Sequence, residues 1–378
     1  MNGIPVARIF GFEIRIHLSW VLIIAVITIL AQVQAETAAP ALAAPVRWAV
    51  GAIIAGAFLL SVLAHELAHG IAARRLGLEV GPITLYFFGG SASFQVESDR
   101  PRDEAIVAAA GPAVSIVIGA VLGGLALLLG TFGDPLLRAA ASILLVMAAL
   151  NLILGVINLV PAYPLDTGRV VRAVVWARTG DERKGARVAA RTGRAIGWLL
   201  IGLGIALMIV DDTIDGLMLA LSGWFLGSTS RGIDRRLVVQ DLLLGVKVED
   251  AMEREVASVA PNLTVDTFGD RLLESGDGSA MPVLADEEIV GLIGATQLRR
   301  LRRGAWSTTR AEDLMVAPPR LTFLEARDTL WSALDRLRRT GLDGLPVVDA
   351  GALLGIVTRQ SIAETIQNRA KLRGVTIR

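Results

Sequence analysis

Long apolar segments recur along the first 230 residues of the chain. They fall near residues 16–34, 48–73, 105–130, 137–160, 195–210 and 214–228. A helix needs about 20 apolar residues to cross a bilayer, so each of the first four segments is predicted to span a membrane. The last two are shorter and are separated by the polar stretch DDTID. We interpret them as two further spans, with a re-entrant hairpin as the alternative.

A different pattern lies between the second and third spans. Residues 78–96 are rich in Thr, Val, Tyr and Phe and are interrupted by glycines, which is typical of short strands rather than of a helix. Strands cannot leave backbone groups unpaired in lipid. We therefore expect this segment to lie at the membrane interface or to line a cavity.

The rest of the chain contains an internal repeat. Three motifs recur after 63 or 64 residues: VEDAM at 248–252 as AEDLM at 311–315, MPVL at 281–284 as LPVV at 345–348, and GLIG at 291–294 as GIVT at 355–358. Each copy alternates helical patterns with short β-branched runs. This predicts a small α/β unit that is present twice.

The predicted fold class is therefore a polytopic α-helical membrane protein followed by a soluble α/β module. We expect about six transmembrane helices and a small membrane-associated β segment. The expected domains are a membrane domain over 1–230, a linker over 231–246, and the two repeats over 247–305 and 306–378.

Composition agrees with a membrane protein. Hydrophobic residues make up 53% of the chain and the mean hydropathy is +0.58, above the level of ordinary soluble domains. Cysteine is absent, which excludes disulfides and cysteine-ligated metals. The net charge is +1, and no basic cluster is interleaved with aromatic residues, so we expect no nucleic-acid partner.

The charges of the loops predict the orientation in the membrane. With six spans, the loops over 74–103 and 161–194 share one side and are rich in arginine. The opposite loops offer Arg47, Arg138 and the acidic DDTID. We therefore expect the basic side to be cytoplasmic and the repeated tail to lie on it.

The stretch AHELAHG places three ionisable residues at the end of an apolar helix. Positions i and i+4 share a helix face, so His65 and His69 are expected to point the same way. Two imidazoles at this spacing can bind one zinc ion and leave Glu66 to take a proton from an activated water. A purely interfacial role is the alternative, but ionisable groups in a membrane helix usually mark function.

The fourth span supplies a candidate for a third ligand. Arg47 and His65 are separated by roughly 27 Å of helix, which places the histidines inside the membrane, toward the cytoplasmic leaflet. The fourth span also runs inward, and two prolines break it just after Asn158. Asp166 follows and is the best candidate ligand; the alternative is that it caps the next helix.

HELAH in one membrane helix and NLVPAYPLDTGR near the end of another resemble the motifs of the site-2 protease family of intramembrane zinc metalloproteases. The resemblance covers roughly residues 1–230. It implies that His65, His69 and Asp166 bind one zinc ion, that Glu66 is the catalytic base, and that Asn158 holds substrate or stabilises the oxyanion.

Other segments carry the same resemblance. AAAGPAVS at 108–115 resembles the Gly-Pro segment of the family's third span, and FFGG at 87–90 resembles its membrane-associated strand. Thr167 stands where the family usually has glycine. We expect the backbone at Gly89, Gly90 and Ser91 to accept an unwound substrate as an added strand, with a simple tight turn as the alternative.

The function that the resemblance implies is regulated intramembrane proteolysis in the cell membrane. The partners are then the lipid bilayer and a transmembrane protein substrate, for which the family suggests an anti-sigma factor or a signal-peptide remnant.

The repeated tail resembles a pair of cystathionine-β-synthase-type (CBS) domains, which often bind adenosine nucleotides. The ribose-contacting pattern of such domains is Thr followed three residues later by Asp. Here Thr358 is followed by Ser361, and Gly294 by Gln297, so the acidic residue is missing in both copies. Thr358 is a candidate for nucleotide binding, but we favour a structural module that forms a homodimer.

Two other functions stay open at this point. Membrane spans with a CBS tail also suit a CBS-gated channel or transporter, in which charges inside the membrane bind ions. The other alternative is an inactive member of the same family that acts as a scaffold, although all the presumed catalytic residues are present.

Overall fold

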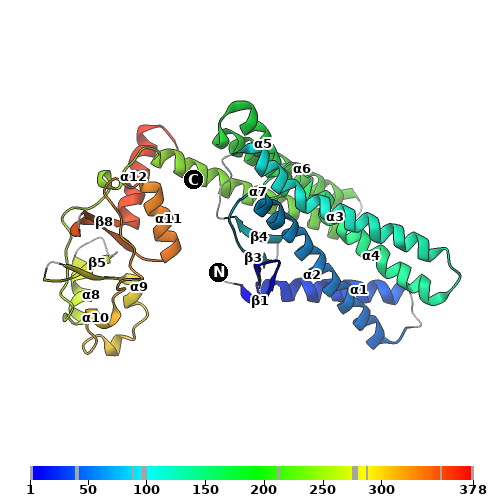
Figure 1. Ribbon diagram of the computed structural model, residues 1–378, viewed down its shortest axis with the longest axis horizontal. Helices are drawn as coiled ribbons and strands as arrows, with labels where there is room; N and C mark the ends of the chain where they lie inside the picture. Colours follow the sequence, from blue (N-terminus) through cyan, green and yellow to red (C-terminus); the bar gives the residue numbers. More distant parts are fainter. Residues whose placement is uncertain are drawn as a thin grey trace. The chain divides into compact units, whose positions relative to one another are not determined.

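The computed structural model describes residues 3–38, 42–86, 89–94, 100–210, 213–274, 280–286, 288–349 and 351–375. The chain forms two compact units, Met1–Asp234 and Arg235–Arg378. Figure 1 shows long helices in the first unit and a mixture of short helices and strands in the second. The expected order, a helical membrane part followed by an α/β part, is confirmed.

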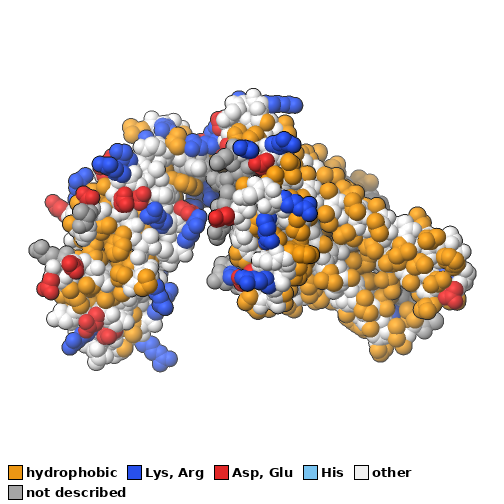
Figure 2. Space-filling model, in the orientation of Figure 1, with side chains coloured by type: hydrophobic (Ala, Val, Ile, Leu, Met, Phe, Trp, Pro, Cys, Tyr) orange, Lys and Arg blue, Asp and Glu red, His pale blue; other side chains and the backbone are white. Residues whose placement is uncertain are grey.

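Helices make up most of the first unit. They are α1 (Ser19–Ala38), α2 (Ala44–Arg75), α3 (Pro101–Gly130), α4 (Pro135–Asn158), α5 (Asp166–Thr179), α6 (Glu182–Val210) and α7 (Thr213–Leu243), the last of which runs on into the second unit. Among the described residues, α1 to α4 and α6 are long and apolar enough to cross a membrane. Hydrophobic side chains dominate the surface of this unit in Figure 2.

Six spans were expected, and α7, the expected sixth, is not among the five candidate spans. The region 195–228 belongs to two long helices, and α7 is less apolar than the five candidate spans. α6 and α7 are antiparallel and very close: a Cβ at Gly197 would lie 2.7 Å from the carbonyl oxygen of Gly223, and one at Gly204 would lie 2.6 Å from the nitrogen of Ala220. Glycine permits such an approach of two helices. Most of the residues expected as a linker, 231–246, are the end of α7.

A four-stranded sheet packs against the helices of the first unit. Its strands are β1 (Ile4–Ile9), β2 (Phe12–Ile16), β3 (Val80–Tyr86) and β4 (Gly89–Phe94), in the order β1-β2-β3-β4, with β2 and β3 parallel and the outer pairs antiparallel. The strands expected over 78–96 are confirmed as β3 and β4, while Phe87 and Phe88 of the FFGG segment and residues 95–96 lie outside the described residues. The sheet buries Phe12, Ile14 and Ile83 against Val62 and Leu67 of α2.

The second unit repeats one pattern. The first copy contains α8 (Val265–Glu274), β5 (Ala280–Ala285), β6 (Glu288–Gly294) and α9 (Ala295–Leu298); the second contains α10 (Ala311–Leu314), α11 (Leu330–Thr340), β7 (Gly344–Asp349), β8 (Ala352–Thr358) and α12 (Arg359–Leu372). The two hairpins have the same register, since Ala280 pairs with Gly294 as Gly344 pairs with Thr358. This confirms the internal repeat.

Both copies contribute to one core of this unit. Ala280 and Leu292 of the first copy pack in the same buried cluster as Leu345, Val347 and Ile356 of the second. The repeat is therefore a pair that folds together.

Candidate metal centre

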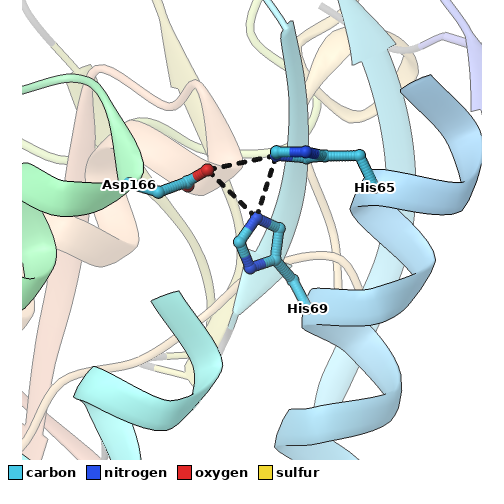
Figure 3. A group of neighbouring side chains, drawn as sticks. All are labelled: His65, His69 and Asp166. Carbon is cyan, nitrogen blue, oxygen red and sulfur yellow. Dashed lines mark hydrogen bonds and ion pairs between the residues drawn. The ribbon is translucent and has the colours of Figure 1, made fainter. Parts of the chain in front are cut away.

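His65 and His69 lie one turn apart on the same face of α2. Their rings are only 3% and 2% exposed, and their Nε2 atoms are 3.2 Å apart. Figure 3 shows both rings projecting from α2 toward one point. The expectation that the i, i+4 spacing brings the two imidazoles together is met by this geometry.

Asp166 reaches the same point from α5. Its Oδ2 lies 3.1 Å from Nε2 of His65 and 3.3 Å from Nε2 of His69. The N-cap position of α5 belongs to Leu165, and Asp166 is the first helical residue. Its carboxylate therefore faces the two histidines instead of capping the helix.

Contacts on the far side of each ring orient the two histidines, and one of them fixes a tautomer. Nδ1 of His69 lies 2.7 Å from the carbonyl oxygen of Val107, and Nδ1 of His65 lies 2.9 Å from Oγ of Ser115. A carbonyl oxygen can only accept, so Nδ1 of His69 carries the proton and its Nε2 presents a lone pair. Such outer contacts orient histidine ligands at metal sites.

α3 leaves room at the meeting point of the three side chains. A Cβ at Gly111 would lie 2.6 Å from Nε2 of His65 and closer still to Nε2 of His69, in the space that an ion bound by both rings would need. Pro112 follows within the helix and cannot donate a backbone hydrogen bond, which loosens α3 locally.

The donor set and its dimensions fit a zinc ion. Two imidazole nitrogens and one carboxylate oxygen are ligands that zinc takes in catalytic sites, with bonds of about 2.0–2.2 Å. Tetrahedral bonds of that length separate the ligand atoms by about 3.3 Å, close to the 3.1–3.3 Å found here. His65, His69 and Asp166 thus form a group able to hold a metal, and a fourth position stays available to substrate or water.

The two other residues expected at the site, Glu66 and Asn158, lie on α2 and α4. Glu66 follows His65 in α2 and is buried, as a base inside the site requires. Asn158 ends α4, and its Nδ2 donates to the carbonyl oxygen of Leu154 in the same helix, at 2.9 Å. Asn151, two turns earlier in α4, connects two helices, because its Nδ2 donates to Oγ of Ser61 in α2, at 3.1 Å.

The segment between α4 and α5 is anchored from α7. Oγ of Ser230 donates to the carbonyl oxygen of Tyr163, at 2.8 Å, and Ser230 is fully buried. Burial also raises the pKa of the Tyr163 phenol to about 12, so this side chain stays neutral. The segment that leads to Asp166 is therefore held by α7.

Charged residues connect α5 to the start of α3. Nε of Arg172 donates to Oε2 of Glu104, at 2.9 Å. Burial lowers the pKa of the Arg172 guanidinium, but the carboxylates of Glu104 and Glu182 outweigh burial and raise it above its ordinary value. Arg172 is charged, and it faces a carboxylate that is only 2% exposed.

The sequence interpretation missed the contribution of α3. Val107, Gly111 and Ser115 occur at intervals of four residues and face the histidines. The regular spacing of small residues in AAAGPAVS was the available signal.

The expected substrate residues lie on β4, and the expected nucleotide residue lies in the second unit. Gly89, Gly90 and Ser91 begin β4, the edge strand, where they pair with Tyr86, Leu85 and Thr84 of β3. Thr358 is buried in the second unit. Its Oγ1 donates to Glu253 at 3.1 Å and accepts from the backbone nitrogen of Ser361 at 3.0 Å, so its hydroxyl group is already engaged.

Comparisons with known proteins agree on both parts of the chain. Residues 53–142 and 134–200 match the family described as Peptidase family M50, and residues 248–304 and 311–368 match the CBS domain. Rip3, a protein of Mycobacterium tuberculosis named as a zinc metalloprotease, is 35% identical over 367 residues, which cover 97% of this chain and 93% of that protein.

Two further relatives have the same character. A protein of Synechocystis named as a zinc metalloprotease is 31% identical over 372 residues, covering 98% of this chain and 97% of that protein. The structure of a site-2 protease from Methanocaldococcus jannaschii is 26% identical and covers 61% of this chain and 94% of its own, with a TM-score of 0.42.

Proposed function

The chain belongs to Peptidase family M50, the site-2 type of zinc metalloprotease, and carries a pair of CBS domains; from this premise we propose that His65, His69 and Asp166 bind the catalytic zinc ion. The observation that carries the proposal is the convergence of three ligand atoms, from two helices that are distant in sequence, within 3.3 Å of one another.

Glu66 is the catalytic base of this proposal. A zinc ion held by the three side chains supplies Lewis-acid activation of water and of the peptide carbonyl. Glu66 takes the proton of the attacking water and later gives it to the leaving amine. A buried carboxylate beside the ligands suits this task, because it lies within the water-poor site where proton transfer is needed.

Asn158 is proposed to bind substrate or to stabilise the oxyanion. One hydrogen of its amide nitrogen donates within α4, and the second can donate to substrate while that bond is kept. An amide donor aimed at a developing oxyanion is a recognised way of lowering the barrier.

The edge strand β4 is the proposed entry point for substrate. A transmembrane helix satisfies its own backbone hydrogen bonds and must unwind before hydrolysis. The outer edge of β4, at Gly89, Gly90 and Ser91, offers backbone groups that an extended peptide can pair with. Its end position in the sheet supports this role. The substrate class is a transmembrane protein, such as an anti-sigma factor or a signal-peptide remnant.

The CBS pair is proposed to lie on the cytoplasmic side of the cell membrane. α7 runs antiparallel to α6 along the contacts of Gly197 and Gly204. If α6 crosses the membrane, α7 therefore returns to the side on which α6 began. The arginine-rich loop over 161–194 lies on that side, and such loops are cytoplasmic.

The CBS pair is further proposed to be a structural, dimer-forming module rather than a nucleotide sensor. Both copies lack the acidic residue of the ribose pattern. The hydroxyl group of Thr358 caps α12 and contacts Glu253, which leaves it poorly placed to receive a ribose. The family membership and the metal-binding geometry favour the protease over a CBS-gated channel or transporter.

The direct test is the isosteric variant Glu66→Gln in the full chain, reconstituted with a membrane-anchored substrate. We expect zinc content to stay at one ion per chain and cleavage to fall by about 10²–10⁴-fold. Glu79→Gln makes the same chemical change at an exposed position on the loop after α2 and should cleave normally. Full activity of Glu66→Gln would remove Glu66 as the base.

A further inference from the structure

Four residues of α3 form one buried face toward the proposed zinc centre. Glu104, Val107, Gly111 and Ser115 are spaced by three, four and four residues and therefore share a side of the helix. All four are buried. Val107 and Ser115 orient the two histidines, and Gly111 clears the space between them. Glu104 lies on the same face, one turn closer to the start of α3, and the proposed mechanism does not use it.

Glu104 contacts the helix that carries Asp166. Its Oε2 accepts a hydrogen bond from Nε of Arg172 at 2.9 Å, and its Oε1 lies 2.5 Å from Nη2 of the same guanidinium. Nε of Arg169 lies 3.7 Å from Oε1. Oε1 has no well-aligned hydrogen bond, so charge attraction holds it, and the pair combines one charge-assisted hydrogen bond at Oε2 with a close ionic contact at Oε1.

The position of Asp166 depends on such contacts between helices. The histidines belong to α2, whereas Asp166 begins α5, about 100 residues later, and its distance from the two rings is set by how α5 packs. α5 packs on α3, and the two arginines lie within two turns of Asp166. Arg172 is also held from α6 by Glu182, whose Oε1 lies 3.4 Å from Nη1.

We propose that Glu104 is a positioning residue for the metal centre: by its ion pair with Arg172 it sets the placement of α5, and thus of the carboxylate of Asp166, relative to His65 and His69. α3 then positions all three ligands. It orients the histidines through Val107 and Ser115, and it positions Asp166 through Glu104.

The energetics of the pair agree with a geometric role. A buried ion pair adds little stability compared with apolar residues of the same volume. An arginine that contacts both carboxylate oxygens, however, fixes orientation closely. Small displacements of a reacting group or ligand have large effects on rate, of about 10²-fold for 1 Å. Loss of Glu104 is therefore expected to change zinc affinity and ligand geometry more than it changes the free energy of unfolding.

The inference rests on the proposed zinc site, and its test separates the two. Full-length chains carrying Glu104→Gln, Arg172→Lys or Asp166→Asn are purified in detergent. Zinc affinity is measured by competition with a chelator, and the visible spectrum of the Co²⁺-substituted protein reports ligand geometry. Asp103→Asn, a neighbouring and less buried carboxylate on the same turn, is the matched control.

We expect Glu104→Gln to bind zinc about 10–100-fold more weakly and to shift the Co²⁺ spectrum toward that of Asp166→Asn. Arg172→Lys keeps the positive charge but loses the planar guanidinium, and it should shift the Co²⁺ spectrum in the same direction by a smaller amount. Asp103→Asn should match the wild-type protein. Thermal unfolding identifies any variant that does not fold. If Glu104→Gln or Arg172→Lys fails to fold, the other of these two variants tests the proposal.

Different results overturn different claims. If wild-type protein and Asp166→Asn share one spectrum and one zinc affinity, the proposed site fails. If those two differ while folded Glu104→Gln or Arg172→Lys is indistinguishable from wild type in both readouts, the site stands and the positioning role of Glu104 is wrong.

Discussion

Ser115 and His65 are 50 residues apart in the sequence, yet Oγ of Ser115 lies 2.9 Å from Nδ1 of His65 on the side away from the metal centre. Together with the contact between His69 and Val107, this relationship turns both Nε2 atoms toward Asp166. The ligand set is thus shaped by α3, a helix that supplies none of the ligands.

The first prediction concerns this serine. Ser115→Ala removes the partner of Nδ1 and leaves the ring of His65 free to rotate or to change tautomer. We expect zinc affinity to fall by about 10–100-fold, measured by chelator competition. Ser142→Ala, at an exposed position of α4, should bind zinc like the wild type. Equal affinity in Ser115→Ala would show that packing alone orients His65.

A second prediction follows from the space at Gly111. Gly111→Ala places a methyl group 2.6 Å from Nε2 of His65, where the ion is expected. We predict a folded protein that loses zinc and proteolysis together. Gly124→Ala lies on the same helix with open space around it and should be neutral or stabilising by up to about 1 kcal/mol. Zinc analysis of both purified variants checks this, and a fully loaded Gly111→Ala would contradict the placement of the ion.

The third prediction concerns the anchor of the segment before Asp166. Ser230→Ala leaves the buried carbonyl of Tyr163 without its donor, which costs about 1–3 kcal/mol. Thermal unfolding in detergent should therefore shift downward. Ser222→Ala, an exposed serine of α7 bonded within its own helix, should leave the unfolding temperature unchanged. An unchanged Ser230→Ala would mean that α7 does not support this segment.

The CBS pair gives a fourth prediction. Calorimetry of the full-length chain with AMP, ADP and ATP should show no saturable heat, because the hydroxyl of Thr358 is held by Glu253 and Ser361. Thr358→Val should instead lower stability by removing the cap of α12, by about 1 kcal/mol. Saturable binding of any of the three nucleotides, lost in Thr358→Val, would restore the sensor function.

Much of the site was predictable because it follows from local periodicity. The i, i+4 spacing of His65 and His69 requires only that α2 be helical, and the prolines after Asn158 required an interruption before Asp166. The internal repeat was visible for the same reason, since its motifs return at one offset. These features depend on chain neighbours and not on distant packing.

Other features needed the tertiary structure. The strands β1 and β2 were not predicted, although Phe12 and Ile14 alternate with Glu13 and Arg15, because strands this short need a paired neighbour and their partner β3 lies more than 60 residues later. The partner of Glu104 lies 68 residues away, and no periodicity announces such a pair. The sixth span was expected from its apolar residues alone. In the structure, α7 packs closely against the glycines of α6, and such a contact between helices cannot be read from hydropathy.

X-ray absorption at the zinc edge of the wild-type chain, loaded with one equivalent of zinc, tests the central claim most directly. The account predicts two imidazole nitrogens and at least one oxygen at about 2.0–2.2 Å, with the oxygen contribution reduced in Asp166→Asn. A zinc ion bound by fewer than two imidazoles, or a spectrum that Asp166→Asn leaves unchanged, would contradict it.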